Sequence, residues 1–416
     1  MMYQWLLALK KPSNKLWVTA TAWAVITAIF VFSLRLGART IEVGVLPHIE
    51  QETLESLLNV IASSMLAVTT FSLSIMVSAF ASASSGATPR ATDLVMGDST
   101  TRTAITSFIC AFIYAIIART ALGMAFYEQN GRFILFISTI AVLLYLIVTL
   151  IRWVYTLSQL GRLGNTLEKI EQVTEKSLRQ YRISPMMGAV STHQFGSKSQ
   201  PLEANASGYL THIDMQGLQR KAEAAEGYIH ICVRPGELIS PDTVLCKVDI
   251  QNEIEFEDLR NCFVFAKGRT FDQDPSWGFI VLSEAGQRAL SAAVNDPGTA
   301  INIMTVMMGL LVKKEEDMPE DKTEYDRLSI IPLDCDEWIR DAFAPLSRDG
   351  AAVLEVNLVM QKVLASIWRN SPDREVATAA LNMAKQAFER ACQSLSLQSD
   401  IHILTKKHKD LFKNAK

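Results

Sequence analysis

The stretch that decides the fold is residues 57–81, LLNVIASSMLAVTTFSLSIMVSAFA, which contains no charged side chain. Residues 16–34, 103–118 and 133–151 are three further stretches without a charge. About 20 mainly apolar helical residues are needed to cross the ~30 Å hydrocarbon core of a bilayer. The pattern therefore predicts a membrane protein with four transmembrane helices within residues 1–156, in direct contact with the lipid bilayer.

Residues 57–81 are unusually rich in hydroxyl groups for a membrane-spanning segment. At helical spacing they place a stripe of small and polar side chains on one face and larger apolar ones on the other. Two interpretations remain open: close packing against other helices, or the lining of a water-filled pore. The stripe predicts the pore-lining candidates Ser63, Thr70, Ser74, Ser78 and Ser82.

The Lys and Arg residues that flank the four stretches indicate the orientation in the membrane. Eight of them lie on the side of the N-terminus, and three, Arg35, Arg39 and Arg132, lie on the other side. Because positive charge favours the cytoplasmic side, we expect both termini in the cytoplasm. The basic start of the chain also suits a cleaved signal peptide, but the apolar run of residues 16–34 favours a retained first helix.

Two arginines complete the set of candidates in the membrane region. Arg119 lies within the third apolar segment, where a charge is costly. It has two interpretations: a side chain that reaches toward the interface or bonds Asn59 or Glu128, or a charge facing a solvated vestibule that would favour anions. Arg90 follows the stripe at its cytoplasmic end and either pairs with Asp93 or contributes to ion selectivity.

Composition excludes several function classes. The net charge of −3 does not indicate a nucleic-acid partner. The six cysteines show neither CxxC spacing nor a histidine cluster, so we predict no metal site and no disulfide framework. Glycine-rich phosphate loops and nucleophile motifs are absent from the sequence. We therefore expect no enzyme and no cofactor.

Beyond the membrane region the chain changes character. Residues 157–206 are expected to form an amphipathic stalk helix and a linker rich in Ser, Gly and Pro. Residues 207–252 alternate like strands and resemble half of a lipoyl-type barrel-sandwich domain. The segment IDMQGL at 213–218 would be its hairpin tip, but it lacks the lysine that carries the cofactor. This predicts a small β barrel-sandwich-like module with a structural or docking role.

Residues 253–416 are expected to form a mainly helical cytoplasmic domain, so the fold class is membrane α-helical plus a cytoplasmic α+β region. The sequence around 295–297 is typical of a helix cap with proline at the first helical position. The alternative interpretation is a polar cluster that binds an ion or ligand. Its candidate members are Arg269, Asp272, Asp274, Asn295 and Asp296.

Two motifs resemble a bacterial family of predicted integral membrane proteins that carries a domain of unknown function. The first, F-S-x-x-x-x-V…S-P-R, matches at Phe71, Ser72, Pro89 and Arg90, with Thr88 in place of serine. The second, Q-D-x-x-x-G…R-A-L-S-x-x-x-N-D-P-x-T-A, matches from Gln273 to Ala300, with Trp277 and Ala292 as departures. The resemblance covers most of residues 15–310. It supports the transmembrane topology, implies a bacterial inner membrane as the location, and implies no established activity.

These observations lead to two functional hypotheses. In the first, the protein is a homo-oligomeric channel or permeation unit that is gated by its cytoplasmic domain. In the second, it is a membrane-anchored sensor or scaffold whose cytoplasmic domain binds a small-molecule ligand or a partner protein. The hydroxyl stripe favours the first, and the polar cluster around Asp274 and Asn295 favours the second.

Overall fold

The computed structural model describes residues 21–33, 46–91, 94, 99–191, 199–252, 254–314 and 323–413. The chain divides into two compact units. The first comprises Met1–Ser85 and Pro89–Thr166, and the second comprises Gly86–Thr88 and Leu167–Lys416. The first unit contains the apolar segments, and the second contains the sheets and the C-terminal helices.

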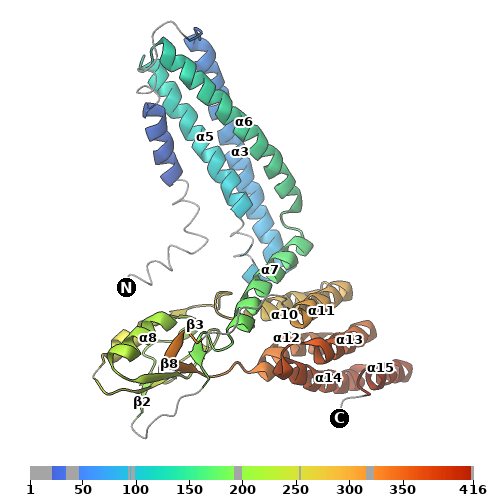
Figure 1. Ribbon diagram of the computed structural model, residues 1–416. Coiled ribbons are helices and arrows are strands. Elements are labelled where there is room, and N and C mark those ends of the chain that lie inside the picture. Colours follow the sequence, from blue (N-terminus) through green and yellow to red (C-terminus); the bar gives the residue numbers. More distant parts are fainter. Residues whose placement is uncertain are drawn as a thin grey trace. The chain divides into compact units, whose positions relative to one another are not determined.

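Within the described residues, three helices are long and apolar enough to cross a membrane. They are α3 (Gln51–Gly86), α5 (Ser99–Gly123) and α6 (Gln129–Gln159), which run side by side in Figure 1. They contain the predicted stretches 57–81, 103–118 and 133–151, which confirms three of the four. The predicted first stretch, 16–34, is described only as the shorter apolar helix Thr21–Ser33, because its remaining residues lie outside the described part of the chain.

The core of the first unit is apolar, with a few polar groups that bond to one another. Leu54, Leu58 and Ile61 of α3 pack with Phe108 of α5 and Leu135 of α6. The same core contains the hydroxyl of Tyr114, which pairs with Ser138 Oγ and Thr139 Oγ1 at 2.8 and 2.9 Å. Because hydrocarbon offers no water to a buried polar group, such internal pairing is what the bilayer requires.

One hydroxyl of α3 faces this core. Ser72 is fully buried, and its Oγ accepts a 2.8 Å hydrogen bond from Nε1 of Trp153, which is 1% exposed. In hydrocarbon no water is available to accept from the indole N–H in place of Ser72. The bond therefore ties α3 to α6.

We expect Ser72→Ala to destabilise the bundle by about 0.6–1.7 kcal/mol, the range measured for side-chain hydrogen bonds within membranes. The loss of the acceptor leaves the buried Trp153 N–H without a partner. The measurement is an SDS titration of the purified full-length protein. Ser74→Ala is the matched control, and equal destabilisation by both substitutions would contradict the assignment.

The second unit begins in α7 (Leu163–Ile183), which follows a turn where Gly161 has φ +78. Among the residues that the structure describes, eight strands form two sheets. The five-stranded sheet has the order β1-β8-β4-β6-β2, with β1, β8 and β4 parallel and the others antiparallel; the three-stranded sheet, β5-β3-β7, is antiparallel. The strands are β1 (Ala189–Val190), β2 (Gln200–Glu203), β3 (Gly208–Ile213), β4 (Tyr228–Ile231), β5 (Leu238–Ile239), β6 (Val244–Asp249), β7 (Phe263–Ala266) and β8 (Tyr325–Ile330).

The predicted barrel-sandwich module is wrong, although the strands expected within 207–252 are present. The structure has two open sheets instead, because β7 and β8 arrive from outside this range and pair with β3 and β4. The expected hairpin tip is a helix, α8 (Met215–Ala224). Asp214 caps it by accepting a 2.9 Å bond from the Gly217 N–H, so the segment turns into a helix rather than back into a strand.

The remainder of the second unit is helical, as predicted. α12 packs on α10 and α14, while α13 packs on α11, α14 and α15. The aromatic ring of Trp338 lies edge-on to Phe279 and Tyr181, which joins α12 to α10 and α7. The helices are α9 (Phe256–Arg260), α10 (Trp277–Leu290), α11 (Pro297–Val312), α12 (Cys335–Asp349), α13 (Leu354–Asn370), α14 (Arg374–Ser394) and α15 (Gln398–Leu411).

Candidate functional site

The predicted pore-lining residues of α3 share one exposed face. Its buried residues, among them Leu58, Met65 and Ser72, lie on the side that packs into the bundle. Ser74 follows Ser72 by two positions, which is about 200° around a helix of 3.6 residues per turn. The stripe therefore lies opposite the buried face and points out of the protomer. Its members, all exposed, are Asn59, Ser63, Ala67, Thr70, Ser74, Ser78 and Ser82.

Several of these hydroxyls already bond within their own chain. Ser63 Oγ donates to Asn59 O at 2.9 Å, Thr70 Oγ1 to Ala67 O at 2.9 Å, and Ser74 Oγ to Thr70 O at 3.1 Å. Ser82 Oγ reaches Gly161 O at 3.0 Å. Such back-bonding satisfies each donor and leaves the oxygen able to accept further bonds. The face is thus compatible with apolar surroundings and also with water or another helix.

Arg119 continues this face. Its Nη1 donates to Asn59 Oδ1 at 2.6 Å, and both residues are exposed. This is one of the two partners expected for Arg119. Because Asn59 is four residues before Ser63, the bond places the guanidinium at the first end of the stripe. Arg90 lies beyond the other end, exposed in the 3-10 turn Pro89–Ala91, and Asp93 is outside the described residues.

In the second unit, Arg269 and Asp274 form a buried ion pair. Arg269 Nε and Nη2 donate to the two carboxylate oxygens of Asp274 at 2.8 and 2.9 Å, and Asp274 is 2% exposed. Its Oδ1 also accepts from the backbone N–H groups of Ser276 and Trp277, at the start of α10. Burial raises the pKa of Asp274, while Arg269 and Ser276 act in the opposite direction. This carboxylate caps a helix and neutralises a cation.

Gln273 and Gly278, which also belong to the first half of the second motif, make local contacts as well. Gln273 Oε1 accepts from Ile213 N at 2.8 Å, and its amide donates back to Ile213 O, so the side chain pairs with the end of β3. Gly278 is where α10 approaches α7, since a Cβ there would lie 1.9 Å from Thr174 Oγ1. Gly236 has φ +102, and a Cβ there would meet Asp274 at 2.5 Å. These contacts give the motif a role in packing the second unit.

The predicted polar cluster does not come together as one group. Asp272 has an exposed side chain, 3.9 Å from His212 Nδ1. Asp296 caps α11, accepting from Thr299 N at 3.0 Å with Pro297 as the first helical residue, which confirms the predicted cap. Asn295 precedes it with φ +50. The fourteen residues of α10 separate these two from Asp274 by about 20 Å of helix.

The second half of the motif is exposed, in contrast to the first. Arg288 and the segment 292–296 lie at the surface, and Val294 is 49% exposed. The first motif also reaches α10. Gly86–Thr88 belong to the second unit, where Thr88 Oγ1 donates to Glu284 Oε2 at 2.9 Å. Threonine in place of the family serine therefore keeps the hydroxyl that makes this bond.

Sequence reasoning overlooked two polar residues with large structural roles. Ser72, quoted only as part of a motif, binds Trp153. Arg182, at the end of α7, is 3% exposed in its side chain and donates to Leu310 O, Leu311 O and Lys313 O at the end of α11. An arginine between apolar positions of an amphipathic helix was the available signal. In the described part of the chain, no group of three His, Cys, Asp or Glu residues is placed to hold a metal ion.

Comparisons with known proteins give one result. No curated protein and no solved structure matches the chain. The model of a protein family described as "Predicted membrane protein (DUF2254)" matches residues 13–366, which includes both motifs and three candidate membrane spans. The chain therefore belongs to this family of predicted membrane proteins.

Proposed function

We propose that the protein crosses a bacterial inner membrane four times, with both termini in the cytoplasm. The helix Thr21–Ser33 supplies the first span, and its end packs against the connection between α5 and α6. Tyr127 Oη donates to Val31 O at 2.5 Å, and the rings of Phe32 and Phe126 meet edge-on at 5.6 Å. The excess of Lys and Arg on the side of the N-terminus supports this orientation.

We further propose that the protein is a homo-oligomeric permeation unit in which copies of α3 surround the pathway. The observation that carries the proposal is the exposed hydroxyl face opposite the buried face of α3. From Asn59 to Ser82 the stripe rises about 35 Å, which exceeds the ~30 Å of hydrocarbon. Hydroxyl groups that recur over this length are less favourable against lipid than in a symmetric ring around a water-filled axis. The exposed side chains of Val60, Phe71 and Val77 lie among them on the same side of α3.

The charges at the two ends suit anions as the permeating species. Arg119 is held by the uncharged Asn59 at 2.6 Å, so this hydrogen bond leaves its positive charge unneutralised. Arg90 lies past the opposite end and is exposed. Rings of arginine side chains are a known basis of anion selectivity in pores. The second unit, which receives Thr88 directly after α3, is the proposed gate.

Reconstituted wild-type protein is expected to conduct in planar bilayers, with anion preference. Ser74→Leu should reduce the unitary conductance at least several-fold, because it puts a bulky apolar side chain on the face of α3 that lines the proposed pathway. Leu66→Phe is the matched control, since Leu66 is 49% exposed but lies about 80° around α3 from Ser74. A protein that never conducts, or equal effects of both substitutions, would refute the pathway.

A docking function is the second candidate, and the exposed segment 292–296 favours it. Motif residues that are buried have packing roles here, whereas Asn295 and its neighbours are displayed at the surface. The shape of the segment 292–296 requires a left-handed backbone at Asn295, and asparagine tolerates this conformation better than most residues do. The conductance measurement separates the two candidates, because a scaffold or sensor without a pathway gives no current.

A further inference from the structure

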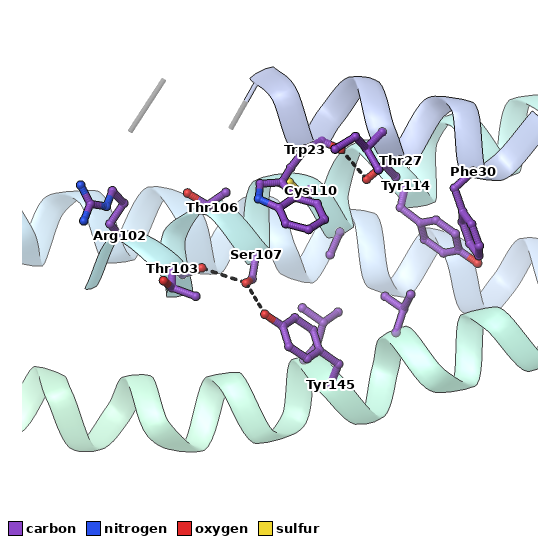
Figure 2. Close-up of a pocket in the computed structure, with 14 residues that line it drawn as sticks. Trp23, Thr27, Phe30, Arg102, Thr103, Thr106, Ser107, Cys110, Tyr114 and Tyr145 are labelled. Carbon is purple, nitrogen blue, oxygen red and sulfur yellow. Dashed lines mark hydrogen bonds between the residues drawn. The ribbon is translucent and has the colours of Figure 1, made fainter. Parts of the chain in front are cut away.

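A groove in the first unit lies between the helix Thr21–Ser33 and α6, with α5 providing half of its lining residues (Figure 2). Its volume is about 610 Å³, within the ~300–1,000 Å³ of typical ligand sites. The groove is open at the side, where Trp23, Ile26 and Tyr145 are 53%, 51% and 54% exposed. None of its lining residues belongs to α3, so this site is separate from the proposed pathway.

The length of the groove matches one leaflet of a bilayer. Along α5 it extends from Arg102 to Tyr114, and Figure 2 shows Arg102 at one end and Phe30 with Tyr114 at the other. Twelve helical residues rise about 18 Å. Half of the ~30 Å hydrocarbon core is about 15 Å. An acyl chain that enters beside Arg102 would therefore reach the middle of the membrane near Tyr114.

The middle of the groove suits hydrocarbon, because most of its hydroxyl groups already have partners; Thr106 Oγ1 is an exception among the lining hydroxyls. Ser107 Oγ donates to Thr103 O at 2.8 Å, so the Tyr145 hydroxyl is the donor in the 2.8 Å bond between Tyr145 and Ser107. Thr27 Oγ1 donates to Trp23 O at 2.8 Å, within its own helix. A polar solute would find few free donors there, whereas an alkyl chain displaces no hydrogen bond.

The Arg102 end has the opposite chemistry. Arg102 lies in the first turn of α5, where the unpaired backbone N–H groups also favour an anion. Among the residues that the structure describes, no carboxylate forms an ion pair with Arg102. A guanidinium presents a fork of donors that matches the oxygens of a phosphate.

We propose that the groove binds one anionic phospholipid of the inner leaflet. The phosphate is bound by Arg102 and the first turn of α5, and one acyl chain lies between Trp23 and Tyr145. An arginine at one end and a mainly apolar channel of one-leaflet length, in which the hydroxyls of Thr27, Ser107 and Tyr145 are hydrogen-bonded, together define a headgroup-and-chain site. The preference for an anionic lipid over phosphatidylcholine should be about fivefold, equivalent to the ~1 kcal/mol that one basic residue contributes near an anionic membrane surface.

The test is native mass spectrometry of the purified full-length protein, titrated with phosphatidylglycerol or with phosphatidylcholine. Wild-type protein should bind one phosphatidylglycerol with about fivefold preference. Arg102→Gln should abolish the preference while retaining weak binding of both lipids. Cys110→Trp, which fills the groove, should weaken the binding of both lipids at least fivefold. Arg152→Gln is the matched control, because Arg152 is exposed on α6 and does not line the groove.

Three results would overturn the proposal. The first is an undiminished preference in Arg102→Gln, which would show that the headgroup binds elsewhere. The second is an equal loss in Arg152→Gln, which would show only diffuse attraction to basic residues. The third is that Cys110→Trp dissociates the oligomer while lipid binding persists, which would assign the groove to a second copy of the chain. Arg102→Gln alters a partly exposed side chain, so its result does not depend on whether Cys110→Trp folds.

Discussion

Replacement of Asp274 by alanine is expected to lower the free energy of unfolding of the second unit by about 3–5 kcal/mol, the typical cost of breaking a buried ion pair from one side. The Arg269 side chain is only 16% exposed and would keep its charge without a counterion. The backbone N–H groups of Ser276 and Trp277 would also lose their acceptor at the start of α10. The measurement is hydrogen exchange of α10 amides in the purified full-length protein.

Two comparisons make this prediction specific. Asp272→Ala removes a carboxylate two residues away whose side chain is 72% exposed. It should change the opening free energy of the α10 amides, as measured by hydrogen exchange, by less than about 1 kcal/mol. The double substitution Arg269→Met with Asp274→Ala removes the stranded charge and should be less destabilising than the sum of the two single substitutions. Additive effects would show that the ion pair contributes nothing of its own.

Replacement of Arg182 by methionine should lower the free energy of unfolding of the second unit by about 3 kcal/mol. Three carbonyls at the end of α11 would lose a hydrogen-bond donor, and each such bond contributes roughly 1 kcal/mol or more. The positive charge of Arg182 also complements the negative end of the helix dipole of α11. Methionine retains much of the length and the apolar stem of arginine, so loss of packing is small. The effect should appear first as faster hydrogen exchange in the last turn of α11.

Arg340→Met is the control for this substitution. Arg182 forms an ion pair with Asp373, 3.2 Å from its carboxylate. Arg340 forms an ion pair with Glu337 at 3.6 Å, but both of these side chains are more than half exposed. Exposed pairs of this kind contribute at most about 1 kcal/mol. If Arg182→Met were no more disruptive than Arg340→Met, the contacts of Arg182 with α11 would be incidental to stability.

Local features of the sequence predict the helices well. Long apolar runs identify α3, α5 and α6, since each needs only its own residues to satisfy its backbone. The Asp296–Pro297 pair likewise predicts the start of α11, because a cap is a contact between residues three apart.

Pairings between distant segments were not predictable in the same way. The strands β4 and β8 are about 100 residues apart, and no local pattern indicates that they pair. The hairpin expected at 213–218 would have paired β3 with the next segment of the chain. In the structure β3 pairs instead with β7, which lies about 50 residues later. In the candidate sites, helical periodicity predicted which α3 residues share a face. It did not predict that Ser72 faces Trp153, or that α10 separates Asn295 from Asp274, because both depend on tertiary packing.

The central claim is that the hydroxyl face of α3 contacts water within the membrane. The direct measurement is labelling of single cysteines, placed at Thr70, Ser74 and Ser78 or at Leu66 and Leu73, by a membrane-impermeant thiol reagent in reconstituted vesicles. The native cysteines are replaced beforehand, and the reagent reacts with thiolates that only water can support. Fast reaction at the first three positions and slow reaction at Leu66 and Leu73 is the predicted result. Uniformly slow reaction at all five positions would contradict it.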